Sequence, residues 1–275
     1  MAARPAATVL VLRRAGEGQQ VFLVRRHGKS GFMAGAHVFP GGTVDPEDRD
    51  PAILARCIGQ EAEEAAARMG EPEDPAGALA FHVAAVRETF EEAGVLLAEG
   101  AERHGRDVLS EARDDLNAGR RSFVAIAEAL DLRLRLDALA AQARWITPIV
   151  EARRYDTRFF IARAPDAQDA SHDAKETTES AWMTPAGALE AAAKGTIQLP
   201  PPTLVTLGWL ADRPNVDDAF AAARARVPPR VMPAFRREGK TLVLALPGDP
   251  AHPIATPAFE GVTRVVLEDG RWWAR

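Results

Sequence analysis

The sequence has little cysteine and no long apolar run. Cys57 is the only cysteine among 275 residues, so an intrachain disulfide is excluded and a reducing compartment fits. No apolar run reaches the roughly 18 residues that a membrane-spanning helix needs. Residues 1–16 carry two arginines after a short apolar run, whereas a secretory signal carries its charge before that run. We therefore expect a cytoplasmic protein with no membrane partner.

An excess of positive charge is also missing. The formal net charge is −5, which argues against a nucleic acid partner because general binding to its backbone requires a basic surface. There is no P-loop, no G-x-G-x-x-G after a strand and no zinc-ligand spacing. His37, His82 and His172 are scattered without a base-and-nucleophile arrangement, so we interpret each as structural. The 47% of hydrophobic residues suffices for one large domain, or for one domain with additions.

Periodicity and turn residues give a mixed pattern of helices and strands. The β-rich runs 8–12 and 21–25 flank Gly16 and Gly18, which predicts a hairpin. A helix over 79–93 should end at Gly94. The other predicted helices are 51–69, most of 109–130, 136–143, 185–194 and one from 203; the other predicted strands are 144–149, 158–162, 181–183, 241–246 and 263–268.

The helix over 79–93 concentrates negative charge. Glu88, Glu91 and Glu92 lie three and four residues apart, so they share one face, opposite an apolar stripe. Like charges at this spacing destabilise a helix by a few tenths of a kcal/mol per exposed pair. One explanation is a solvated face with Arg87 nearby. The other is a hard divalent cation, which needs several oxygen ligands and cancels the repulsion.

Two segments resemble the Nudix box, the signature of the Nudix hydrolases. Residues 87–95, RETFEEAGV, are similar to its second half, and residues 39–42, FPGG, are similar to its opening. The box usually places its arginine 14 residues after the second glycine, whereas Arg87 follows Gly42 by 45 residues. The position of the first box glutamate falls on Asp48 when counted forward and on Leu79 when counted back, so Asp45, Asp48 or neither replaces that acid.

The interruption resembles a Nudix subgroup whose box is split by a helical segment, with the peroxisomal coenzyme A diphosphatase as its best-known member. The likeness extends over about residues 8–210. Residues 35–42 match the end of a signature associated with coenzyme A substrates, although Gly31 stands where that signature has an arginine. The segments that carry the likeness are 31–42, 87–97, 145–148, 153–160, the surroundings of Trp182 and 201–203.

The resemblance implies an α/β fold, the Nudix α/β/α sandwich with a mixed sheet. It also implies a Nudix domain over 1–200. Residues 43–80 would form a helical insertion within the box that covers or edges the active site. Residues 201–275 would form a C-terminal extension of helix and strands packed on the same domain.

The resemblance also implies roles for site residues. It makes Glu91 and Glu92 metal ligands, and Glu88 a ligand or the base that activates water. Arg87 would orient a carboxylate. Gly41 and Gly42, the substrate-binding glycines, would let the backbone approach the site and carry φ > 0.

A distal acid and several arginines complete the expected site. Glu176 is the expected distal metal ligand, with Glu179 as its competitor. Arg153, Arg154 and Arg158 could meet the phosphates of a substrate, or could form the exposed face of a strand; of these, Arg154 and Arg158 are our substrate-binding candidates.

The function that follows from the resemblance is hydrolysis of a diphosphate bond that depends on Mg²⁺ or Mn²⁺. We expect coenzyme A or acyl-CoA as the substrate, cleaved to 3′,5′-ADP and a phosphopantetheine product. One alternative keeps the chemistry but acts on ADP-ribose, NADH or a nucleotide sugar. Another is a ligand sensor without turnover, which would not need the three glutamates. The expected partner is a small nucleotide, and a homodimer stays open.

Overall fold

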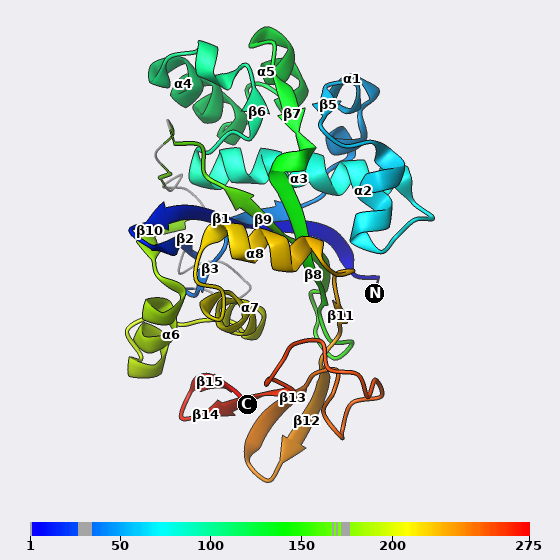
Figure 1. The fold of residues 1–275 in the computed structure, drawn as a ribbon, viewed down its shortest axis with the longest axis vertical. Helices are drawn as coiled ribbons and strands as arrows, with labels where there is room; N and C mark the ends of the chain where they lie inside the picture. Colours follow the sequence, from blue (N-terminus) through cyan, green and yellow to red (C-terminus); the bar gives the residue numbers. More distant parts are fainter. Residues whose placement is uncertain (1, 27–34, 167, 169, 172–176) are drawn as a thin grey trace.

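A mixed sheet forms the centre of the molecule (Figure 1). The computed structural model describes residues 2–26, 35–166, 168, 170–171 and 177–275. The central strands run in the order β10-β2-β1-β9-β8-β11; β1 pairs in parallel with β9, and β8 with β11. Their bounds are β1 Arg4–Ala15, β2 Gly18–Arg26, β8 Leu139–Ile146, β9 Tyr155–Arg163, β10 Thr177–Met183 and β11 Arg230–Val231.

The first two strands form the predicted hairpin and then diverge. They pair from Ala15 and Gly18 as far as Leu12 and Val21. Beyond that point β1 pairs with β4 (Gly41–Thr43) and β2 pairs with β3 (His37–Val38). The loop between β3 and β4 therefore lies where the hairpin opens, and it holds Gly41 and Gly42 against β1.

The predicted acidic helix is α3 (Pro75–Ala93), which crosses one face of the sheet (Figure 1). It begins four residues earlier than predicted because Asp74 accepts a hydrogen bond from Gly77 N and Pro75 fills the first turn. It ends at Gly94, as predicted, in the left-handed conformation (φ 69°).

Two apolar cores, one on each face of the sheet, confirm the predicted α/β/α sandwich. One core packs α3 against β1, β2 and β9, and the other packs α7 and α8 against the opposite face. Helices α7 and α8 come from the predicted extension, so that segment supplies part of the second helical layer. The helices on this side are α6 Pro185–Lys194, α7 Pro201–Ala211 and α8 Val216–Arg224.

The insertion is not the long helix predicted over 51–69, which is wrong. It forms short elements instead, because the chain turns at Gly59 (φ 83°), where a Cβ atom would lie 2.3 Å from Asp137 Oδ1. The elements are η1 Pro46–Arg49, α1 Pro51–Leu54, β5 Cys57–Ile58 and α2 Ala62–Met69. Strand β5 then joins β7 (Arg133–Arg135) and β6 (Ala98–Glu99) in a small sheet.

The helix predicted over 136–143 is also wrong. Only the 3₁₀ turn η3 (Leu136–Ala138) forms, and strand β8 follows. Its alanines favour a helix locally, but pairing with β9 outweighs that preference. The helical prediction for 109–130 is met by α4 (Arg106–Asn117) and α5 (Phe123–Ala129), with η2 (Ala101–Arg103) before them.

The C-terminal part of the chain ends in a separate antiparallel sheet, at the bottom of Figure 1. The strands predicted over 241–246 and 263–268 are both present. The boundary predicted at residue 200 stays a prediction. Within the described residues, no helix is long and apolar enough to cross a membrane. The strands are β12 Ala234–Glu238, β13 Thr241–Ala245, β14 Arg264–Glu268 and β15 Arg271–Ala274.

Candidate active site

Arg87 is the centre of the candidate site. Its Nε and Nη2 donate to the two carboxylate oxygens of Asp48, at 2.8 and 2.9 Å. Nη2 also donates to the Thr43 carbonyl oxygen at 2.8 Å. Nη1 donates to Glu88 Oε1 at 2.8 Å and to Glu91 Oε2 at 3.1 Å. All five N–H groups of this buried guanidinium therefore have acceptors, which fixes the side chain.

Asp48 brings the insertion into the site. Its residue is 1% exposed, and besides Arg87 it accepts a hydrogen bond from Asp45 N at 2.8 Å. Asp45 itself lies farther out, with 3.7 Å between its Oδ2 and Arg87 Nη2. Leu79 packs against the apolar core. Of the three positions considered for the first box acid, Asp48 is thus the one that contacts Arg87 through both carboxylate oxygens. That Asp48 replaces the first box glutamate stays a prediction.

Gly41 and Gly42 lie directly against the acidic face of α3. Gly41 N donates to Glu92 Oε2 at 2.9 Å. A Cβ atom on Gly42 would lie 2.5 Å from Glu88 Oε1, and one on Gly41 would lie 2.3 Å from the Ala7 carbonyl oxygen. A side chain at Gly42 would thus displace the Glu88 carboxylate, whereas Gly41 is needed because it lies against β1 and has a φ of 154°. The positive φ expected for Gly42 is not found.

The acidic face is not solvated, so that explanation is wrong. The insertion and β4 cover it, and Glu88 and Glu92 are only 8% and 6% exposed. Burial raises the pKa of Glu88 to about 8; Arg87 opposes that rise, and the charges of Glu91 and Asp48 add to it. Burial also raises the pKa of Glu91. One guanidinium faces several carboxylates, so the site has a surplus of negative charge.

The donor chemistry of this site suits a hard divalent cation, because carboxylate oxygens are its preferred ligands. Burial disfavours the ionised form of Glu88, and a bound cation would supply the missing counter-charge. Within the described residues, however, no three acidic, histidine or cysteine side chains converge as a metal site. Glu88 and Glu91 turn to Arg87, and Glu92 turns to Gly41 N. The metal-binding roles of the glutamates therefore stay predictions.

Neither candidate for the distal metal ligand is seen in the acidic cluster. Glu176 lies outside the described residues. Glu179 is exposed on β10, where Arg25 Nη1 contacts its Oε1 at 3.0 Å.

Arg153 is exposed, and Arg154 is half-buried, with its Nε donating to the Thr147 carbonyl oxygen at 3.1 Å. The substrate-binding role of Arg154 stays a prediction.

Arg158 is buried and paired with an acidic residue of the insertion. It is 7% exposed, and its Nη2 donates to both oxygens of Glu71, at 2.7 and 2.9 Å. Its guanidinium also lies 3.9 Å from the centre of the Phe81 ring. Arg158 therefore does not lie on an exposed strand face, and its substrate-binding role stays a prediction.

No pattern in the sequence indicates the network of ion pairs around Glu71. Glu71 follows α2 and also accepts a hydrogen bond from Arg144 Nη1 at 2.6 Å, while Asp156 accepts two from the same arginine. These contacts attach the end of the insertion to β8 and β9. The partners lie 73 and 87 residues from Glu71, beyond the reach of any local pattern.

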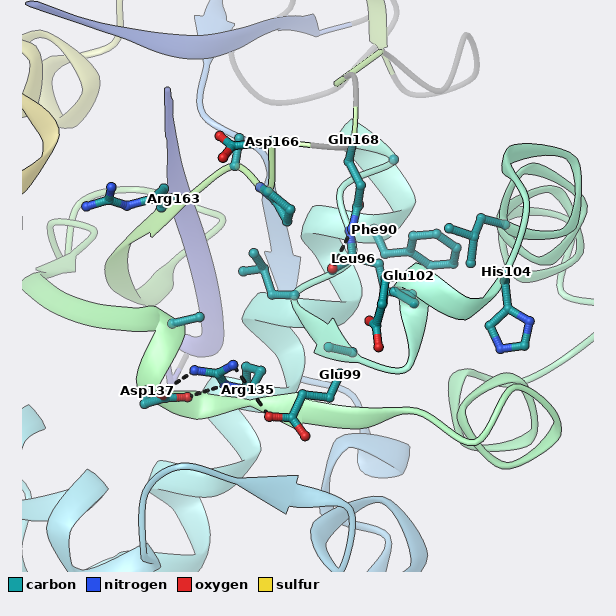
Figure 2. Close-up of a pocket in the computed structure, with 18 of the residues that line it drawn as sticks. Phe90, Leu96, Glu99, Glu102, His104, Arg135, Asp137, Arg163, Asp166 and Gln168 are labelled. Atoms are coloured by element: carbon teal, nitrogen blue, oxygen red, sulfur yellow. Dashed lines mark hydrogen bonds and ion pairs between the residues drawn. The ribbon is translucent and has the colours of Figure 1, made fainter. Parts of the chain in front are cut away.

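A recess of about 1180 Å³ lies beyond the C-terminal end of α3 (Figure 2). Gln168 forms two hydrogen bonds with the Leu96 backbone on one side of it. On another side, Arg135 pairs with Asp137 and Glu99. None of the acidic cluster around Arg87 lines this recess.

The Asp48→Asn substitution should destabilise the protein by about 3 kcal/mol, because it removes a charge partner from buried Arg87. Urea unfolding measures this. Glu47→Gln in the same short helix is the matched control, since Glu47 is exposed and should have little effect. Equal stabilities of the two variants would contradict the importance of the Asp48–Arg87 contact.

The pH dependence of stability should change in Glu88→Gln. The folded-state pKa of Glu88, about 8, exceeds its ordinary value of 4.5, so the protonated carboxyl favours folding and that advantage disappears as the pH rises to 8 and above. In a chelator, the variant should match the wild type near pH 5 and be more stable at pH 9, by on the order of 2 kcal/mol. Glu63→Gln, exposed on α2, is the control; a constant difference at both pH values would refute the raised pKa.

Comparisons with known proteins agree with this fold and motif. Residues 60–210, more than half of the chain, match the family described as the NUDT19 Nudix domain. The Homo sapiens protein named acyl-coenzyme A diphosphatase NUDT19 is 30% identical over 306 residues, covering 94% of this chain and 80% of its own. The Xenopus laevis protein of the same name is 28% identical, covering 90% and 75%.

A solved structure supports the same assignment. The crystal structure of a Nudix hydrolase from Alicyclobacillus acidocaldarius superimposes with a TM-score of 0.67 and 27% identity, covering 83% of this chain and 98% of that one. The chain therefore belongs to the NUDT19 Nudix domain family and is a Nudix hydrolase.

Proposed function

We propose that this protein hydrolyses the diphosphate bond of coenzyme A or acyl-CoA, giving 3′,5′-ADP and phosphopantetheine or its acyl derivative. The observation that carries the proposal is the buried acidic cluster around Arg87, held against the glycines of β4. A surplus of buried carboxylates is costly for stability and is explained if the site works with a cation and an anionic substrate.

The residues of the chain divide the work in this proposal. Glu88, Glu91 and Glu92 would hold Mg²⁺ or Mn²⁺, which when bound neutralises phosphate charge and makes water more acidic. Arg87 keeps Glu88 and Glu91 oriented through its hydrogen bonds. Glu88, held by its hydrogen bond to Arg87 Nη1, is also the candidate to accept a proton from water.

The choice of coenzyme A rests on likeness. Two relatives that cover most of this chain are named acyl-coenzyme A diphosphatases. Residues 35–42 also match the end of the coenzyme A signature, whereas Gly31 departs from it. The substrate is thus the part of the proposal that most needs a direct test.

A substrate panel should give preferential cleavage of coenzyme A or an acyl-CoA. The protein is incubated with Mg²⁺ or Mn²⁺ and with coenzyme A, acetyl-CoA, ADP-ribose, NADH or UDP-glucose, and products are separated by chromatography. Preferred cleavage of one of the last three would replace the substrate but keep the chemistry. Binding without any product would favour the ligand sensor and contradict the proposal.

The Glu91→Gln and Glu92→Gln variants should each lower kcat at least about 100-fold, because each loses a metal-ligand charge worth several kcal/mol. Steady-state rates with coenzyme A measure this, and circular dichroism checks that the fold is kept. Glu63→Gln, an exposed glutamate on α2, is the matched control and should keep its rate. Wild-type rates in either site variant would refute the metal roles.

A further inference from the structure

Exposed apolar side chains gather at the end of the molecule that carries the C-terminal sheet. Among the described residues, seven large apolar side chains are exposed, and five of them lie in the segments 149–150, 232–235 and 254. Ile149 and Val150 lie in the turn between β8 and β9 and are the most exposed of the seven, at 74% and 67%. Single exposed apolar side chains are ordinary, whereas a group of them marks an interaction surface.

Strand pairing brings the first two of these segments together. Strand β11 runs parallel to β8, with Val231 opposite Trp145. Because parallel strands leave their pairing in the same direction, Met232 and the connection 147–154 emerge at the same end of β8. In Figure 1 this green connection lies beside β11, next to the C-terminal sheet.

Hydrogen bonds attach the third segment to β12. His252 Nε2 lies 3.1 Å from the Met232 carbonyl oxygen, and Arg236 Nη2 donates to the Ala251 carbonyl oxygen at 3.0 Å. Ile254 therefore belongs to a loop that is held against β12. The five apolar side chains share one region, which we call the C-terminal patch; they are Ile149, Val150, Met232, Phe235 and Ile254.

The C-terminal patch also carries positive charge. Residues 230–240 hold four basic residues and one acidic residue, a net charge of +3 in a chain whose net charge is −5. The connection 147–154 adds two arginines against Glu151. All four basic side chains of 230–240 are exposed: Arg230, Arg236, Arg237 and Lys240.

Within the residues that the structure describes, these four charges have no acidic partner. The acid of the same segment, Glu238, is paired with Arg264 instead, at 3.6 Å. Exposed arginines elsewhere do have such partners, as Arg120 has Asp115 at 2.7 Å. The positive charge of the C-terminal patch is thus left to attract a partner outside the chain.

The combination of charge and apolar side chains limits what can cover this surface. A second copy of the chain would place like charges against one another, which opposes self-association. An anionic partner is complementary. Apolar side chains on separate turns suit a fluid anionic lipid surface, because they enter the interface individually while arginine and lysine meet the headgroups. An acidic protein would need a fixed surface that matches all three segments.

We infer that the C-terminal patch binds the surface of an anionic lipid membrane. The lack of a membrane-spanning segment led us to expect no membrane partner, but binding at a surface requires no span. Ile149, Val150 and Phe235 would enter the headgroup region, and the four basic side chains would contact lipid phosphates. The inference is independent of the proposed function, because no residue of the acidic cluster takes part.

Sedimentation of the full chain with lipid vesicles tests the inference. The protein should bind vesicles that mix phosphatidylcholine with phosphatidylglycerol but not phosphatidylcholine alone, and salt should weaken the binding. Each basic side chain near an anionic surface contributes about fivefold, so Arg236→Gln/Arg237→Gln should bind about 30-fold more weakly. Ile149→Ser/Val150→Ser should weaken binding at least about tenfold. All four positions are exposed, and circular dichroism checks the fold.

The matched controls are Arg103→Gln/Arg120→Gln, which removes two exposed arginines, and Val108→Ser, which removes an exposed apolar side chain. These positions lie in or next to α4, at the opposite end of the molecule from the C-terminal sheet (Figure 1), and should keep the binding of the wild type.

No binding to the mixed vesicles, equal binding to phosphatidylcholine alone, or wild-type binding by both patch variants would overturn the inference. Polyglutamate tests the competing partner, an acidic protein. Binding to polyglutamate as tight as to the mixed vesicles, with no effect of Ile149→Ser/Val150→Ser on either, would replace the lipid surface by an acidic protein. Failure of the coenzyme A assay would leave a positive vesicle result intact.

Discussion

The five hydrogen-bond donors of one buried guanidinium hold the candidate active site together. Arg87 connects α3 to the insertion through Asp48 and to β4 through the Thr43 carbonyl oxygen, and it orients Glu88 and Glu91 on its own helix. Elements that are far apart in sequence therefore meet at one side chain. The two halves of the box are far apart in sequence, but Asp48 of the insertion contacts Arg87 of the second half and so attaches the insertion to the site.

This arrangement gathers more negative charge than it neutralises. Burial raises the pKa of Glu88 to about 8, and the nearby carboxylates of Glu91 and Asp48 reinforce that effect. A fold selected for stability alone would place apolar side chains here. The cost is understandable if the site exists for chemistry with cations and phosphates, as in other sites where ionisable groups have strongly shifted pKa values. Gly42 contributes by leaving room for the carboxylate of Glu88.

Local patterns predicted the elements that local chemistry controls. Gly94 ends α3 because the chain there adopts a left-handed conformation, and the hairpin follows from its turn glycines. The resemblance to the Nudix box also predicted that the acidic residues and the two glycines of β4 share one site, and the structure brings them together. The sequence did not indicate the burial of Arg158, whose partner Glu71 is 87 residues away. Its helix prediction was wrong for 136–143, where sheet pairing outweighed helix propensity. From the charge pattern alone, the acidic residues of α3 also fitted a solvated helix face. The structure shows that the insertion covers that face.

The central claim is that the acidic cluster around Arg87 binds a divalent cation. A crystal structure of the protein grown with Mn²⁺, with anomalous diffraction measured at the manganese edge, tests it most directly. We predict an anomalous peak in contact with carboxylate oxygens of Glu88, Glu91 and Glu92, absent from crystals of Glu91→Gln. A well-ordered site with no peak there, and with these side chains still bonded to Arg87 and Gly41, would contradict the claim.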